Sequence, residues 1–262
     1  MSGYCIACEE KPAAKRVVVV GLASCFGCQL QITNAEAHLL DVLGQIDVRY
    51  WQLTSSEPMP EQFDVAVIEG AVTTEESAET VRRLRERAAA VIVIGACANT
   101  AGIPGMAAER FLSRPLEVYG GDVPDACGEM IAPRPVDAMI DVDFRVRCCP
   151  IDPYDFIDVL HRALWGSNRS IPTKTLCGEC KRNERTCFFS KQTLCLGLVT
   201  TAGCGARCPN LGRPCNGCAG LSPDANLESA RDACVRYGVD VPAFDKALEM
   251  FNQTNPALAR AE

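Results

Sequence analysis

The sequence lacks the features of a membrane-spanning, exported or nucleic-acid-binding protein. Its longest apolar runs, residues 17–20 and 88–94, have the length of strands and are too short for membrane helices. The N-terminus carries neither a signal h-region nor a twin-arginine leader, so we expect a cytoplasmic protein. The net charge of −7 argues against nucleic acid or an anionic membrane as the main partner. We also find no catalytic nucleophile, no acid–base pair and no GxGxxG loop for a dinucleotide.

Cysteine, in contrast, is abundant, with 17 in the chain. Thiols stay reduced in the cytoplasm, so dense cysteine indicates metal or redox chemistry more often than disulfides. Eight cysteines fall in one short window as two CxxC pairs with four single cysteines between them: Cys177, Cys180, Cys187, Cys195, Cys204, Cys208, Cys215 and Cys218. This irregular spacing favours two iron–sulfur sites of four thiols each. Zinc is the serious alternative, and a disulfide framework fits least well.

The chain divides into four segments by composition. Residues 1–15 form a polar extension, and residues 16–166 alternate between strand and helix patterns. Residues 167–222 lose this periodicity and are rich in Gly, Pro, Cys and basic residues, so we expect metal to serve as their core. Residues 223–262 resume a helical pattern.

The second segment has the pattern of an α/β domain. Strands are expected at residues 17–21, 46–50, 64–68, 90–95 and 144–148. Helices are expected as one stretch after the loop at residues 23–28, after a capping box of Thr73 and Glu76, and after the Asp152–Pro153 cap. This alternation predicts a parallel, doubly wound sheet.

Four further cysteines follow the expected strands. Cys25 and Cys28 come after the first strand, Cys97 after the fourth and Cys149 after the fifth. The carboxyl ends of parallel strands lie at one edge of the sheet, where such folds hold their ligands, so these thiols can converge on one cluster. The alternative is a single redox-active CxxC pair, with the other cysteines merely buried.

Several segments together resemble the small subunit of a nickel–iron hydrogenase. They are LASCFGCQLQI, VIEGAV, VIGACA and CCPID, followed by CLGLVTTAGCGARCP and CNGC, and the match runs from about residue 17 to residue 220. In that family a flavodoxin-like domain holds the proximal cluster, next to a large subunit that carries the nickel–iron site. The C-terminal cysteine region holds the medial and distal clusters. The resemblance therefore implies a flavodoxin-like domain followed by an irregular cluster-binding domain.

The resemblance implies three 4Fe–4S clusters, each held by four cysteines. The proximal ligands would be Cys25, Cys28, Cys97 and Cys149; the medial ligands Cys204, Cys208, Cys215 and Cys218; and the distal ligands Cys177, Cys180, Cys187 and Cys195. The family usually has Gly-Cys-Pro at the fourth proximal ligand. This chain has two adjacent cysteines there, and we prefer Cys149 to Cys148 because Cys149 precedes the proline.

Two departures from the periplasmic or membrane-bound type are informative. Cys177 stands where that type has a distal histidine, and Cys208 adds a fourth medial ligand. This all-cysteine pattern is similar to cytoplasmic hydrogenases that exchange electrons with NAD(P) or other soluble carriers, above all to the delta subunit of the NADP-linked sulfhydrogenase type. The short NAD-linked small subunit fits less well, because it lacks the eight-cysteine region.

The resemblance implies an electron relay between the large subunit and a flavin or iron–sulfur partner that reduces NADP or NAD. The nickel–iron centre, FAD and NAD(P) would then be bound by partner subunits. Transfer to a heterodisulfide reductase or another soluble acceptor is the alternative. A complex I subunit shares the α/β domain but typically has adjacent cysteines in its first motif, and a zinc-bound scaffold would hold no iron.

Other chemistry-bearing residues have open or structural interpretations. Glu69 either tunes the proximal site or is a solvated acid at a strand end. His38 and His161 are interpreted as packing or surface residues, and Cys127 and Cys234 as unligated thiols. Cys5 and Cys8 either bind metal or form an inert pair, and we leave them out of the ligand sets. A basic group surrounds the C-terminal cysteines: Lys181, Arg182, Arg185, Lys191, Arg207 and Arg213. It could raise a cluster potential, dock an acidic partner or be a solvated surface.

Overall fold

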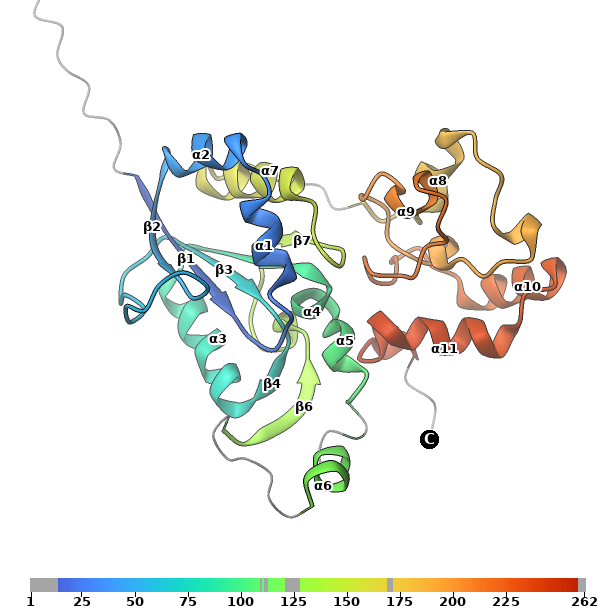
Figure 1. Cartoon of the computed structure of the whole chain (residues 1–262), viewed down its shortest axis with the longest axis horizontal. Helices are drawn as coiled ribbons and strands as arrows, with labels where there is room; N and C mark the ends of the chain where they lie inside the picture. Colours follow the sequence, from blue (N-terminus) through green and yellow to red (C-terminus); the bar gives the residue numbers. More distant parts are fainter. Residues whose placement is uncertain (1–13, 109, 111–112, 121–127, 169–171, 259–262) are drawn as a thin grey trace, which may run out of the picture.

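The protein consists of an α/β domain and a cysteine-rich region that lie side by side (Figure 1). The structure is a computed structural model that describes residues 14–108, 110, 113–120, 128–168 and 172–258. The last helix of the α/β domain ends at residue 164. The first helix of the cysteine-rich region begins at residue 177, and this region includes two C-terminal helices. Within these ranges no helix is both long and apolar enough to cross a membrane.

A five-stranded parallel sheet forms the centre of the α/β domain. Its strand order is β2-β1-β3-β5-β7, the order of flavodoxin-like folds. The strands are β1 (Lys15–Gly21), β2 (Ile46–Trp51), β3 (Val65–Glu69), β5 (Ala90–Ile94) and β7 (Phe144–Val146). All five were predicted, and the parallel α/β fold is confirmed.

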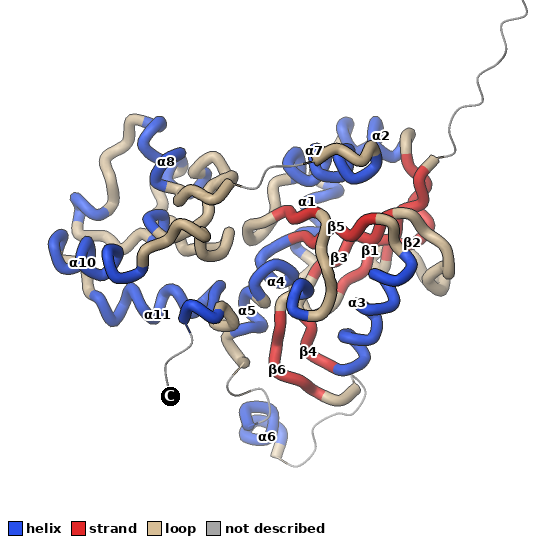
Figure 2. The backbone as a smooth tube through the Cα atoms, turned by 180° about the vertical axis from the view of Figure 1, so that it is seen from behind, coloured by secondary structure: helices blue, strands red, loops and turns tan. Residues whose placement is uncertain are grey.

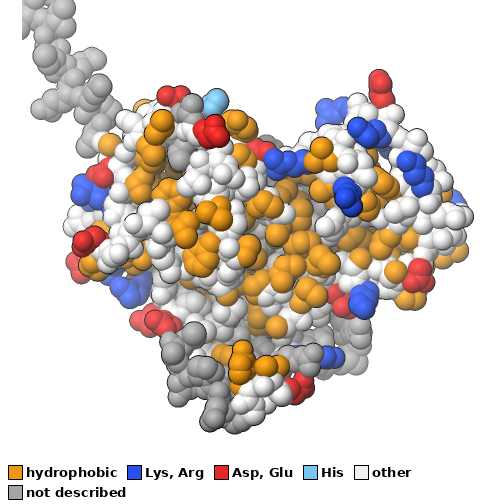
Figure 3. All heavy atoms as spheres, viewed as in Figure 1, with side chains coloured by type: hydrophobic (Ala, Val, Ile, Leu, Met, Phe, Trp, Pro, Cys, Tyr) orange, Lys and Arg blue, Asp and Glu red, His pale blue; other side chains and the backbone are white. Residues whose placement is uncertain are grey.

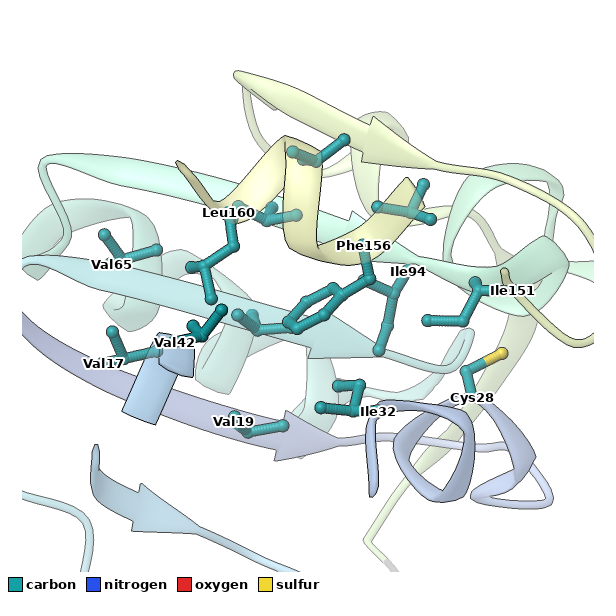
Figure 4. Packing of buried hydrophobic residues seen from close by; sticks show 14 of the residues in the cluster. Val17, Val19, Cys28, Ile32, Val42, Val65, Ile94, Ile151, Phe156 and Leu160 are labelled. Carbon is teal, nitrogen blue, oxygen red and sulfur yellow. The ribbon is translucent and has the colours of Figure 1, made fainter. Parts of the chain in front are cut away.

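Helices cover both faces of this sheet and bury its apolar side chains. On one face, α1 (Gly27–Thr33), α2 (Ala37–Leu43) and α7 (Pro153–Leu164) pack over alternate valines and isoleucines of the strands. Figure 4 shows this layer, with Cys28 at its edge beside Ile32 and Ile151. On the other face, α3 (Glu75–Arg87) and α4 (Gly95–Thr100) contribute Val81, Leu84 and Ala98. A strand buried on both faces must be apolar throughout, which explains the continuous hydrophobic runs.

Three local details differ from the sequence predictions. The helical stretch after the first strand is broken into α1 and α2, because Glu36 lies between them with a φ of 49°. The capping box of α3 is formed by Thr74 and Ser77, one residue after the predicted one. An antiparallel pair, β4 (Val72–Thr74) with β6 (Met130–Arg134), was not predicted. The remaining elements of the domain are α5 (Gly102–Gly105), α6 (Ser113–Tyr119) and the 3₁₀ helix η2 (Val136–Ala138).

The cysteine-rich region is built from short helices and loops. They are α8 (Cys177–Cys180), η3 (Lys181–Asn183), η4 (Phe189–Lys191), η5 (Leu196–Leu198) and α9 (Arg207–Asn210). They are followed by α10 (Leu227–Tyr237), α11 (Val241–Asn252) and η6 (Pro256–Leu258). A small hydrophobic core joins these short elements to the two C-terminal helices. In it, Phe189 and Leu196 pack against Phe244 and Leu248. The predicted segment boundary at residue 222 therefore falls within elements that share one core.

The cysteine-rich region lies beside the edge of the sheet where the parallel strands end. Figures 1 and 2 both show α11 next to α5, and the Thr254 hydroxyl donates to the carbonyl of Thr100 at 3.1 Å. A second contact is the ion pair of Arg207 with Asp152, at 3.3 Å. These contacts bring the eight C-terminal cysteines next to the four of the α/β domain.

Candidate metal centres

Four cysteines of the α/β domain meet at the carboxyl edge of the sheet. Cys25 lies in the loop after β1, Cys28 on α1, Cys97 on α4 and Cys149 before α7. The negative charge of each thiolate would be felt by the others: the Cys97 site interacts with Cys149 and Cys25, and the Cys28 site with Cys149 and Cys97. The structure therefore brings all four predicted proximal residues together.

Gly95 leaves room for this group. It has a φ of 81°, and a Cβ atom built on it would lie only 2.5 Å from the Sγ atom of Cys28. A side chain at this position would clash with the thiol and would strain the backbone. The turn from β5 into α4, which carries Cys97, thus depends on glycine.

Glu69 is buried under the same edge, with only 1% of its surface exposed. Its carboxylate accepts hydrogen bonds from the backbone amide of Cys28 at 3.0 Å and from the side-chain amide of Gln29 at 2.9 Å. The interpretation of Glu69 as a solvated acid is therefore wrong. Glu69 fixes the start of α1, where Phe26 occupies the N-cap position with a side chain that cannot accept a hydrogen bond.

Gln29 and Trp51 extend this network, and the sequence analysis missed both. The Trp51 indole N–H donates to the Gln29 side-chain oxygen at 2.8 Å, and Gln29 is fully buried. The sequence did contain one signal of this network: a glutamine directly after a candidate ligand, on the inward face of a short helix. Buried polar groups of this kind are retained where they fix a conformation.

The cysteine-rich region holds two further groups of four thiols. The Cys177 thiol lies close enough to Cys195, Cys180 and Cys187 to be perturbed by their charge. The Cys208 thiol is perturbed by Cys218 and Cys204, and the Cys215 thiol by Cys195 of the neighbouring set and by Cys218. These are the predicted distal and medial sets, and each set is brought together.

The three sets follow one another in space. At one junction, the Cys149 thiol feels the charge of Cys218. At the other junction, the backbone amide of Cys215 donates to the sulfur of Cys195 at 3.3 Å. The medial set is therefore close to both the proximal and the distal set.

Cys148 and Cys149 are neighbours in the chain but differ in their surroundings. Cys149 feels the charge of Cys218 and Cys25 and lines an open cavity with Cys25 and Cys97, whereas Cys148 does not line that cavity. Both residues line a cavity of about 590 Å³ at the junction of the two regions, together with Cys204, Cys208 and Cys218. This placement supports Cys149 as the fourth proximal residue.

Burial and mutual repulsion make most of these thiols hard to ionise. Burial raises the pKa of Cys97 and of Cys177 to about 11 and that of Cys215 to about 12, and it also raises the pKa of Cys28. A thiolate ligand is the ionised form, so a cationic centre in each set would offset this cost. Among the described residues, no group of three or more Cys, His, Asp or Glu side chains is placed to hold a single metal ion. Three sets of four mutually repelling thiols have the donor chemistry that iron–sulfur clusters require.

The remaining candidates have different surroundings. His38 is exposed and stacks edge-on against Tyr154, and His161 lies on α7 with a buried, unbonded Nε2 atom. Cys234 is fully buried in the core of the C-terminal helices. Cys5, Cys8 and Cys127 lie outside the described residues. All six side chains of the basic group are exposed, and Lys181 lowers the pKa of the Cys177 thiol against the effect of burial.

Comparison with known sequences identifies the family. A family model described as NADH ubiquinone oxidoreductase, 20 Kd subunit, matches residues 25–163 and thus more than half of the chain. A subunit of the F420-non-reducing hydrogenase vhu of Methanocaldococcus jannaschii is 31% identical, over 90% of this chain and 91% of the relative. The delta subunit of sulfhydrogenase 2 of Pyrococcus furiosus is 33% identical, over 80% and 87%. The chain belongs to this 20 Kd subunit family, and these relatives confirm the predicted resemblance to hydrogenase small subunits.

Solved structures share the fold. A chain of the NAD⁺-reducing [NiFe]-hydrogenase in the H2-reduced state superposes with a TM-score of 0.53 at 22% identity, covering 61% of this chain and 96% of that one. A chain of the Dm. baculatum [NiFeSe]-hydrogenase gives 0.56 at 17% identity, covering 80% and 96%. At these identities the likeness shows the fold alone. The second match extends over more of this chain than the first.

Proposed function

We propose that this chain is the electron-transfer small subunit of a cytoplasmic nickel–iron hydrogenase. It would relay electrons between the nickel–iron site of a large subunit and an NAD(P)-reducing partner through three 4Fe–4S clusters. The observation that supports the proposal is the series of three four-thiol sets, in which the medial set is close to each of the other two. Thiols needed only for packing would have no reason to form such a series.

The chain's own part is to hold the clusters and to set their surroundings. Cys25, Cys28, Cys97 and Cys149 would hold the proximal cluster, and the medial and distal sets would hold the other two. A 4Fe–4S cluster supplies reversible one-electron redox chemistry at a potential set by its surroundings. Glu69 contributes here by fixing the backbone amide of Cys28, so that the first ligand pair keeps its orientation.

We assign the surface around the proximal set to the interface with the large subunit. Cys25 and Cys149 are exposed, and with Cys97 they line an open cavity of about 1000 Å³. Ile103 and Met106 at its rim are 47% and 53% exposed. Figure 3 shows hydrophobic side chains gathered over the middle of this face, where the two regions meet. Such a face is typical of an obligate subunit interface.

We assign the surface around the distal set to the docking of the electron acceptor. Cys187 is exposed, and Lys181, Arg182 and Arg185 are exposed near it in the sequence. Cations here would attract an acidic partner and favour the reduced state of a nearby cluster. A partner that reduces NADP or NAD, with its own flavin, is supported by the 33% identity with the sulfhydrogenase delta subunit and by a 27% identity with the delta subunit of the NAD-reducing hydrogenase HoxS of Cupriavidus necator.

A second candidate differs only in the acceptor. The acceptor would be a heterodisulfide reductase or another soluble carrier. The subunit of the F420-non-reducing hydrogenase of Methanocaldococcus jannaschii, which is similar over 90% of this chain, is named for a carrier that it does not reduce, and this leaves another acceptor open. Purification of the native complex separates the two: a flavin-containing subunit that reduces NAD(P) supports the first, and a reductase without this activity supports the second.

The relay is tested with Cys25→Ser in the assembled complex. Because Cys25 is exposed, its replacement should leave the fold intact. We expect hydrogen-driven reduction of the acceptor to fall by at least about 100-fold, since the first cluster loses a ligand. The exchange of H2 with deuterated water needs no electron to leave the large subunit and should continue. Cys234→Ala is the control with an unligated thiol, and reduction by Cys25→Ser at the wild-type rate would refute the relay.

A further inference from the structure

The C-terminal helix α11 lies against the supports of two neighbouring thiol sets. It contacts α4 and α5 of the α/β domain and η5 of the cysteine-rich region, and Figures 1 and 2 both show it beside α5. Helix α4 carries Cys97 of the proximal set. Cys215 and Cys218 of the medial set belong to residues 215–220, which we call the medial loop. The end of α11 meets both α4 and this loop.

Asn252, the last residue of α11, lies against the medial loop. It is 1% exposed. A Cβ atom built on Gly217 would lie 3.7 Å from its Nδ2 atom, and one built on Gly220 would lie 3.9 Å from its Oδ1 atom. The Nδ2 atom donates to the carbonyl of Leu248 at 3.1 Å, which fixes the amide group on the helix. The amide therefore supports the loop at two glycines, one on each side of Cys218.

Thr254 ties the end of the same helix to α4. Its hydroxyl donates to the carbonyl of Thr100, the last residue of α4, at 3.1 Å. The medial loop meets α4 at this point too, because a Cβ atom built on Gly220 would lie only 2.9 Å from the Cγ2 atom of Thr100. Gly220 has a φ of 82°, so the close approach and the backbone both require glycine. Helix α4, the loop and the end of α11 thus form one packed junction.

We propose that Asn252 and Thr254 are positioning residues that set the spacing between the proximal and medial sites. This inference rests on the proposed function, because the spacing matters only if both sites hold clusters. Asn252 supports the loop that carries Cys215 and Cys218, and Thr254 fixes that support to the helix that carries Cys97. Electron transfer slows steeply with distance, because the electron must tunnel through the protein between the two sites. A helix that touches both supports therefore controls the rate without providing a ligand.

The test is electron paramagnetic resonance of the purified, fully reduced complex. Spin–spin interaction between neighbouring clusters splits their signals, and the splitting falls steeply with distance. Asn252→Ala removes the support of the loop, and Thr254→Val removes the hydroxyl with little change of shape. We expect the splitting between the proximal and medial signals to narrow in both variants, and hydrogen-driven reduction of the acceptor to slow, because the loop can then move away from α4. Iron content should not change.

Two further variants make the comparison specific. Thr254→Ser keeps the hydroxyl that donates to Thr100 and should retain the wild-type splitting. Met250→Ala is the control on the same helix, because Met250 is 38% exposed and its replacement should leave the splitting unaltered. A role in stability alone would leave the splitting of the intact complex unchanged in every variant.

Two results would overturn the inference while leaving the relay intact. One is an unchanged splitting in both Asn252→Ala and Thr254→Val, and the other is an equal narrowing in Thr254→Val and Thr254→Ser. If Asn252→Ala loses iron, Thr254→Val decides alone, because it leaves the side chain that supports the loop in place. Failure of the proposed function is distinct, because the wild-type complex would then contain no iron and no acid-labile sulfide.

Discussion

The two regions of this molecule are organised by different kinds of residue. In the α/β domain, two apolar layers enclose a parallel sheet, and side chains such as Leu84 and Ile92 are completely buried. In the cysteine-rich region, α8 and α9 have four residues each, and the 3₁₀ helices have three. Helices this short have little stability of their own. The comparison indicates that hydrophobic burial specifies the α/β domain. The short elements of residues 172–222 share one small apolar core with the C-terminal helices and otherwise depend on their thiols.

The largest difference between the regions should follow the removal of metal. Oxidation of the anaerobic complex followed by a chelator should lower the protection of residues 172–222 against hydrogen exchange, because the clusters that tie their loops together would be lost. The sheet of the α/β domain should remain protected, since apolar side chains form its core. Hydrogen exchange read by mass spectrometry checks this. Equal loss of protection in both regions would contradict the distinction.

Shortening a buried leucine should affect the two regions in different ways. Leu84→Ala in the α/β domain should lower the free energy of unfolding by about 2–5 kcal/mol, because it leaves a cavity in a closed core. Leu248→Ala, in the small core under the distal set, should also reduce the iron content. The measurements are chemical denaturation and iron analysis.

The control for both leucine variants is Leu40→Ala on α2. Leu40 is 70% exposed, so the change should stay within about 0.5 kcal/mol and leave the iron content unaltered. A loss of iron in Leu84→Ala equal to that in Leu248→Ala would argue against separate supports for the two regions.

Replacing Glu69 tests the buried polar network of the α/β domain. Glu69→Ala should destabilise the domain by about 1–3 kcal/mol, because it leaves the Cys28 amide and the Gln29 side chain buried without an acceptor. The stability can be measured by denaturation followed by tryptophan fluorescence, because the Trp51 indole donates a hydrogen bond within the same network. The exposed Glu61→Ala is the matched control, and equal stability of the two variants would mean that Glu69 has no positioning role.

The smallest effect is expected at the cap of α3. Thr74→Ala removes the side chain that accepts from the Ser77 amide at 3.1 Å and should cost about 1 kcal/mol. Thr73→Ala, one residue earlier, removes no cap and should cost less. Denaturation of both variants measures the difference, and the reverse order would support the capping box that the sequence predicts over the one that the structure shows.

Most strands and helices of the α/β domain could be predicted, because the sequence patterns that mark them are local. Buried parallel strands appear as apolar runs, and the Asp152–Pro153 start of α7 is a short-range capping pattern. The break at Glu36 and the pairing of β4 with β6 could not be predicted, since a positive φ and a distant strand partner leave no local trace. Cysteine spacing indicated metal sites, and the family resemblance assigned the cysteines to three sets. Neither could predict the burial of Glu69 or the position of Cys148 in one cavity with Cys204 and Cys218, which depend on how distant segments pack.

The most direct measurement of the central claim is the iron and acid-labile sulfide content of the purified complex, combined with electron paramagnetic resonance of the reduced state. The account predicts about twelve irons for this chain, beyond those of its partners, and signals from interacting 4Fe–4S clusters. Zinc in place of iron, or a chain with iron at the proximal set alone, would contradict it.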